Sequence, residues 1–223
     1  EWESVGAEGW NYQNCLPYFK KLETHRCRTS EYTGTDGPVA ISGGNNMRNP
    51  LYRAFVDAGV EAGYAETEDY NGYRQEGFGQ KFMNVDAGVR ASTSHAYLRS
   101  AGRRANLTVL KRALVTGITF EGKTATGIKC RIKGRTKTFA ATREVILCAG
   151  AMGPPQLLQV SGVGPKTVLN KAGIEMEHEL PGVGENLQDH LEFNFQYNCK
   201  QPISLNGSLG LFSKALIGLR WLL

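Results

Sequence analysis

The chain has 223 residues, of which 41% are hydrophobic and 21% charged, and its formal net charge is +5. This composition is typical of a globular protein and excludes the disordered and fibrous classes. The basic residues are spread along the chain and form no stripe interleaved with aromatic residues, which argues against nucleic-acid binding. The five cysteines contain no C-x-x-C pair, which favours reduced thiols and gives no metal site.

Helical and polar segments alternate in the first hundred residues. Apolar residues at helical spacing predict helices over 11–23 and 49–63, separated by a short strand over 38–42. Residues 64–79 are polar and aromatic-bearing and too long for an incidental turn, so we expect a functional loop there. A strand over 81–86 and a helix from Ser92 to Leu98 complete this part.

From residue 106 onward the hydrophobic period changes to two. The pattern predicts four strands, over 106–111, 113–122, 124–134 and 136–150, with hairpin turns at Gly122 and Gly134. The last strand ends in an apolar run over 145–148, followed by Ala149-Gly150-Ala151 and a helix opened by proline. A buried strand, a glycine turn and the free N–H groups of a first helical turn can hold a phosphate or a flat cofactor, although an ordinary βα unit has the same pattern.

The remaining residues continue the mixed pattern. They predict helices over 155–160 and 166–171, strands over 174–179 and 191–199, and a helix from Gly207 onward. The fold class is therefore mixed α/β (α+β). The chain has no apolar run of about 18 residues that would span a bilayer. It begins at Glu1 and stops within an apolar window, so we expect an internal part of a longer protein.

Two motifs carry a family resemblance. The run Gly150-Ala151, Pro155 and SGVGP at 161–165, followed by LPGVGENLQDH at 180–190, resembles the glucose–methanol–choline oxidoreductases. The segments GWNYQNCLPYFKKLE, DGPVAIS, NGYRQEGFG, RASTSHAYL and NLTVL are similar to that family in the same order. One departure is Pro154, which stands where the family usually has serine. From Asn186 to the end, the chain looks most similar to the choline-oxidising branch.

The resemblance implies an FAD-dependent oxidation of an alcohol, here choline to betaine aldehyde, by hydride transfer to the flavin. Another primary alcohol, aliphatic or polyether, is the first alternative, and a binding domain without flavin is the second. The implied organisation is a cap or substrate-side segment over 1–90, part of an FAD-binding domain over 91–189, and the start of a substrate-binding domain with antiparallel strands over 190–223. The family's G-x-G-x-x-G unit and catalytic histidine do not occur in these residues, so we expect no catalytic residue and no activity from this chain alone.

The resemblance also assigns site residues. It places Val115 at the adenine, and it places Ala149, Gly150 and Ala151 along the flavin. Asn186, Asp189 and His190 would lie beside the flavin, and Glu192 would hold the quaternary ammonium group, because such a group needs aromatic faces and a nearby carboxylate. Each assignment has a plainer interpretation. Val115 would be a strand core residue, and 149–151 would form a tight βα turn. Residues 186–190 would form a solvated turn, and Glu192 would be an exposed strand glutamate.

The implied partners are a small-molecule alcohol substrate and no nucleic acid. A homodimer would cover exposed sheet edges. The electron acceptor would decide between a cytoplasmic location and peripheral association with the inner membrane.

Overall fold

The computed structural model describes residues 1–43 and 47–222. The chain divides into two compact units, which are described separately below. Unit 1 consists of Glu1–Leu107 with Gln196–Leu223, and unit 2 consists of Thr108–Phe195. Within the described ranges, no helix is long and apolar enough to cross a membrane.

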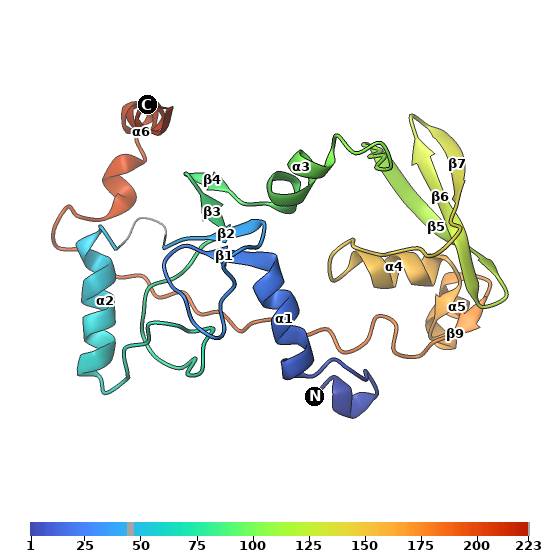
Figure 1. The fold of residues 1–223 in the computed structure, drawn as a ribbon, viewed down its shortest axis with the longest axis horizontal. Helices are drawn as coiled ribbons and strands as arrows, with labels where there is room; N and C mark the ends of the chain where they lie inside the picture. Colours follow the sequence, from blue (N-terminus) through green and yellow to red (C-terminus); the bar gives the residue numbers. More distant parts are fainter. Residues whose placement is uncertain (44–46, 223) are drawn as a thin grey trace. The chain divides into compact units, whose positions relative to one another are not determined.

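Two helices of unit 1, drawn in Figure 1, each begin directly after an asparagine whose side chain caps the helix. The side chain of Asn11 accepts the N–H of Asn14 at 2.9 Å and starts α1 (Tyr12–Leu22), and Asn49 accepts the N–H of Leu51 at 2.9 Å and starts α2 (Pro50–Glu61). The two predicted helices are confirmed. The other helical elements are η1 (Glu3–Val5), η2 (Ser94–Leu98), α3 (Arg99–Ala101), η3 (Leu205–Ser208) and α6 (Leu211–Leu222).

Unit 1 contains two pairs of short strands. Parallel strands β1 (Glu23–His25) and β2 (Val39–Ile41) pair beside the antiparallel pair β3 (Val85–Asp86) and β4 (Val89–Arg90). A small core forms where Val39, Ala40 and Ala91 pack together. The strand predicted over 81–86 is confirmed at its last two residues, which pair with β4, while Met83 forms only an isolated bridge with Ser42.

The loop over 64–79 has neither helix nor strand, as predicted, and α2 anchors it. The ring of Phe78 lies against Gly59, where a larger side chain would collide with it, and also packs on Phe55 with ring centroids 5.2 Å apart. Arg53 forms a bidentate ion pair with Glu66, with N–O distances of 2.7 and 3.0 Å. This pairing raises the pKa of Arg53 and lowers that of Glu66.

Unit 2 is built on an antiparallel meander. Strands β5 (Ala113–Glu121), β6 (Thr124–Ile132) and β7 (Arg135–Ala140) pair in chain order, and the predicted hairpins at Gly122 and Gly134 are confirmed. Helix α4 (Gly153–Val160), strand β8 (Val163–Gly164), helix α5 (Lys166–Ala172) and strand β9 (His178–Glu179) follow, with β8 parallel to β9. Leu169 of α5 is fully buried.

Four strand predictions need correction. Residues 106–111 and 191–199 form no strand, the strand predicted over 136–150 ends at Ala140 and leaves out the run over 145–148, and the strand predicted over 174–179 is reduced to β9. A strand exists only where another segment satisfies its backbone groups, and no described segment pairs with these runs. The meander therefore has three strands and not four.

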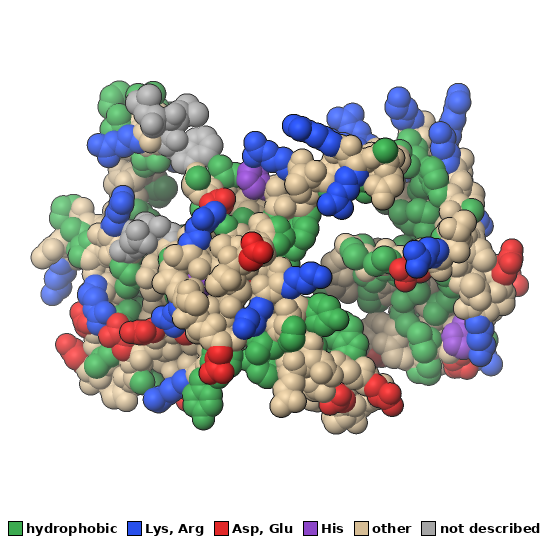
Figure 2. All heavy atoms as spheres, in the orientation of Figure 1, with side chains coloured by type: hydrophobic (Ala, Val, Ile, Leu, Met, Phe, Trp, Pro, Cys, Tyr) green, Lys and Arg blue, Asp and Glu red, His purple; other side chains and the backbone are tan. Residues whose placement is uncertain are grey.

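On the face drawn in Figure 2, Lys and Arg side chains are spread over many elements.

Candidate functional site

The best-defined site of unit 2 is the place where α4 meets β5. The ladder between β5 and β6 is irregular between Val115 and Gly117, so the strand bulges there. Ser161, just after α4, accepts the N–H of Ile118 at 2.8 Å and donates to the C=O of Leu157 at 2.6 Å. One hydroxyl therefore joins the end of the helix to the strand directly after the bulge.

An apolar cavity of about 440 Å³ opens beside this junction. The sheet lines it with Val115, Ile128 and Phe139, the segment over 144–149 forms a second wall that includes Ala149, and Leu157 of α4 contributes as well. β5 is an edge strand, so alternate backbone N–H and C=O groups along it face no partner strand. The cavity has mainly apolar walls and reaches the edge strand at Val115, and such walls suit a flat aromatic ring.

Gly150 and Ala151 lie in the turn between this wall and α4. Gly150 has a φ of +82°, a conformation that glycine adopts without strain, while a side chain there would meet no other atom. The glycine is therefore required by backbone conformation and not by space. Ala149, Gly150 and Ala151 are all exposed.

The first turn of α4 is poor in hydrogen-bond donors. Pro154 and Pro155 are its second and third residues, and proline has no N–H group. The free donors at this end are thus reduced to those of Met152 and Gly153. Two free donors favour a flat ligand over a phosphate at this turn, and the binding of either one stays a prediction.

The second glycine turn, at 161–164, has a clear physical reason. Gly162 has a φ of +84°, and a Cβ there would lie 2.6 Å from the backbone oxygen of Glu175. Its own C=O accepts the N–H groups of Glu177 and His178, at 2.9 and 3.1 Å. This close approach of two backbones places β9 beside β8.

The polar cluster from Asn186 onward does not reach the cavity. Asn186 has a φ of +57°, Asp189 accepts the N–H of His190 at 2.8 Å, and Glu192 follows in a segment without secondary structure. All four residues are exposed. The structure therefore brings Val115 and Ala149 together at the cavity. Gly150 and Ala151 follow Ala149 in the chain without lining the cavity, and Asn186, Asp189, His190 and Glu192 do not line it either.

Sequence reasoning missed the residue that organises the site. In the sequence, Ser161 stands out only as the first residue of a glycine motif, and Ile128, Phe139 and Leu157 of the cavity walls belong to no motif. Alternation along β6 and β7 would have identified Ile128 and Phe139 as neighbours on one face, since the register pairs them directly. Nothing in the sequence indicates the bond between Ser161 and Ile118.

Comparison with known proteins identifies the family. A family model described as GMC oxidoreductase matches residues 1–192. The chain belongs to the GMC oxidoreductase family. Its mixed α/β fold is therefore confirmed as that of a GMC oxidoreductase.

The similar curated proteins are longer than this GMC chain. It is 57% identical to the oxygen-dependent choline dehydrogenase of Photobacterium profundum, in an alignment that covers 100% of the chain and 39% of that protein. The protein of the same description from Chromohalobacter salexigens is 52% identical, over 97% of the chain and 39% of the relative. The chain therefore spans about two fifths of the length of these relatives.

Two solved structures share the fold. An FAD-dependent oxidoreductase from Chaetomium thermophilum superposes with a TM-score of 0.78 at 31% identity, over 84% of this chain and 35% of that one. The pyridoxine 4-oxidase from Mesorbium loti superposes with a TM-score of 0.72 at 32% identity, over 81% of this chain and 36% of that one.

Proposed function

We propose that this chain is part of an FAD-dependent choline dehydrogenase, which oxidises choline to betaine aldehyde. The observation that carries the proposal is the apolar cavity shared by Val115 and Ala149, two residues far apart in the chain that the family resemblance assigns to the cofactor. Support for choline comes from relatives named choline dehydrogenases that are 57% identical over the full chain. Their name also includes oxygen dependence, which favours oxygen as the electron acceptor.

The residues present fit part of FAD. The cavity volume of about 440 Å³ lies in the range of small-molecule pockets, and its apolar walls suit an adenine or isoalloxazine ring. The two prolines at the start of α4 do not suit a diphosphate, which must be held elsewhere in the longer protein. When bound, FAD supplies the acceptor for the hydride that leaves the alcohol carbon.

The roles of this chain's residues follow from their chemistry. Val115 offers the edge of β5 to the adenine, while Ala149, Gly150 and Ala151 are small enough for the ring system to pass close to the backbone. Asn186, Asp189 and His190 shape the loop beside the flavin. No group of the chain is assigned as the base that removes the hydroxyl proton, so the chain alone is inactive.

Glu192 is the proposed ammonium ligand. A quaternary ammonium has no N–H to donate, so its recognition relies on a carboxylate and on aromatic faces. Phe193, Phe195 and Tyr197 are the nearest aromatic residues along the chain, and all three are largely exposed in this structure. Because 191–199 is not a strand, no alternation places them on the face opposite Glu192.

The domain assignment is part of the same proposal. Residues 91–189 would belong to the FAD-binding domain, and residues 1–90 and 190–223 to the cap and substrate side. The exposed strand β7 at the edge of the sheet is a candidate for burial by the rest of the protein or by a second copy. A cytoplasmic location follows from oxygen as the acceptor, and association with the inner membrane follows from a membrane-bound one.

The test compares alcohols with the full-length protein. Choline and straight-chain primary alcohols are oxidised by the wild type and by Glu192→Gln, and kcat/KM is measured for each. We expect the substitution to reduce kcat/KM for choline at least about tenfold and to leave straight-chain alcohols unchanged. Glu185→Gln, a nearby exposed glutamate, is the matched control.

Other outcomes select the alternatives. If the wild type prefers straight-chain alcohols, the substrate is another primary alcohol and the enzyme is not a choline dehydrogenase. If the full-length protein is purified without flavin absorbance and gains none when FAD is added, the binding domain without flavin is the correct assignment.

A further inference from the structure

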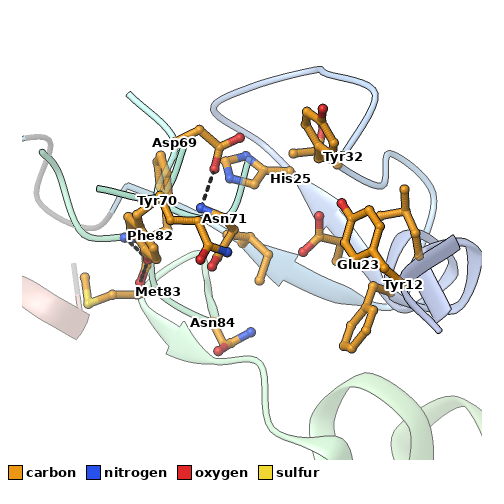
Figure 3. Close-up of a pocket in the computed structure, with 15 residues that line it drawn as sticks. Tyr12, Glu23, His25, Tyr32, Asp69, Tyr70, Asn71, Phe82, Met83 and Asn84 are labelled. Carbon is orange, nitrogen blue, oxygen red and sulfur yellow. Dashed lines mark hydrogen bonds between the residues drawn. The ribbon is translucent and has the colours of Figure 1, made fainter. Parts of the chain in front are cut away.

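A second pocket, in unit 1, has the chemistry of a cation site. Its volume is about 430 Å³, and it lies between α1, strands β1 and β2 and the loop over 64–79. Figure 3 shows Tyr12, Glu23 and Tyr32 grouped on one side, and Asp69, Tyr70 and Phe82 on the other, with His25 between the two groups. The role proposed above for this chain uses none of these residues.

One side of the pocket is a rigid aromatic wall. Phe82 stacks on Tyr70 with ring centroids 5.6 Å apart and meets the edge of His25 at 4.7 Å. The hydroxyl of Tyr70 accepts the N–H of Phe82 at 3.0 Å, and the side chain of His25 is buried. Contacts of this kind hold the rings in place before any ligand arrives.

The charge on the same side is already balanced. The carboxylate of Asp69 lies 3.4 Å from the guanidinium of Arg28, which also lies over the ring of Phe82 with its Cζ 5.9 Å from the centroid. Arg28 therefore shows that a cation is accommodated against this aromatic wall. It approaches from outside the pocket and does not line it.

The carboxylate of Glu23 has no such partner. Its Oε1 accepts the N–H of Gly34 at 3.0 Å, and among the described residues it makes no ion pair. The described lining residues include no Lys or Arg. The side of the pocket formed by Glu23, Tyr12 and Tyr32 thus presents one uncompensated negative charge flanked by two aromatic rings.

We propose that this pocket binds a small organic ammonium cation, with the charge against Glu23 and the methyl or methylene groups against Tyr12, Tyr32 and the ring wall. A carboxylate and aromatic faces around a cavity of this size are the features that recognise methylated ammonium groups. The site does not depend on the proposed function, because Glu192 belongs to unit 2 and Glu23 to unit 1.

Calorimetric titration of the 223-residue chain with tetramethylammonium chloride tests the site, with sodium chloride keeping the ionic strength constant. tert-Butanol serves as a neutral probe of similar shape. We expect saturable binding of tetramethylammonium and at least about tenfold weaker binding of tert-butanol, because the carboxylate attracts only the charged probe.

Variants locate the bound cation. Glu23→Gln keeps an oxygen that can accept the N–H of Gly34, so it removes the charge without removing that bond, and we expect Kd to rise about tenfold. Tyr32→Leu should also weaken binding by removing a ring. Glu61→Gln, on the exposed end of α2, should leave Kd unchanged. Glu192→Gln is measured beside it to separate this pocket from the ammonium site proposed in unit 2.

Three results would overturn the proposal: no saturable binding, equal affinity for the charged and neutral probes, or an unchanged Kd in Glu23→Gln. A Kd that rises only in Glu192→Gln would likewise reject this pocket and assign the cation to unit 2. Circular dichroism of each variant, compared with the wild type, verifies that the chain is folded.

Discussion

Replacement of Ser161 by alanine tests how the junction between α4 and β5 is held together. The Ser161 hydroxyl accepts the N–H of Ile118 at 2.8 Å and donates to the C=O of Leu157 at 2.6 Å. Ile118 is only 8% exposed, so water has little access to replace the lost acceptor. A buried N–H without a partner costs about 1–3 kcal/mol, and we expect Ser161→Ala to destabilise unit 2 by that amount.

Two measurements check this expectation. Urea unfolding followed by circular dichroism gives the free energy of unfolding, and hydrogen exchange followed by NMR reports on the amide of Ile118, which should exchange faster in the variant. Thr116→Ala is the control, because its hydroxyl also bonds to a backbone oxygen, that of Lys129 at 3.3 Å, but on an exposed residue. The control should change stability by less than about 0.5 kcal/mol.

The reasoning is refuted if Ser161→Ala unfolds with the free energy of the wild type and the Ile118 amide keeps its protection. A second consequence concerns the cofactor. Because the bond lies directly after the bulge at Val115, its loss should loosen the β5 edge and reduce FAD retention by the full-length protein. The flavin absorbance that remains after gel filtration measures this retention.

Three further predictions concern stability. Leu169→Ala leaves a cavity at a fully buried position of α5 and should lower the free energy of unfolding, measured with urea, by about 2–5 kcal/mol. A decrease below about 1 kcal/mol would contradict the burial of this side chain. Gly162→Ala should lower the thermal midpoint more than Gly182→Ala, because only Gly162 has a positive φ and a backbone oxygen in the way, and equal midpoints would disprove this reason. The hydrogen bond with Arg53 lowers the pKa of Glu66 in the folded chain. As the pH falls, the Glu66 carboxylate is therefore protonated in the unfolded chain before it is protonated in the folded chain. The ion pair therefore stabilises the loop above the ordinary pKa of glutamate, and this stabilisation is lost as the pH falls through the lowered value. Thermal scans of wild type and Arg53→Met from about pH 7 to pH 3 should converge at the acid end, and a constant difference would exclude the ion pair as the cause.

Local chemistry explains what was predicted correctly. Helices α1 and α2 begin at Asn11 and Asn49 because each side chain caps its own helix, and a cap involves only residues a few positions away. The hairpin at Gly134 is likewise local, since Lys133 and Gly134 both have positive φ and form a two-residue turn. Such features can be read from neighbouring residues.

Strand predictions failed where no described segment pairs with the predicted run. The apolar run over 145–148 and the alternating run over 191–199 both have strand-like side chains. Side-chain pattern does not supply the hydrogen bonds of a ladder, so neither run is a strand in this structure. The assignment of Asn186 and Glu192 to a common site depends on the same missing information, and their convergence stays a prediction.

The sequence by itself determined the family, the mixed α/β class, the main helices and the two hairpins of the meander, because motifs, caps and hydrophobic periods involve residues close together in the chain. Only the tertiary structure revealed the bond between Ser161 and Ile118, the cavity beside Val115 and Ala149, and the pocket around Glu23. Each of these depends on side chains from separate elements that meet only when the chain is folded. Their distances are set by packing, and no spacing along the chain encodes them.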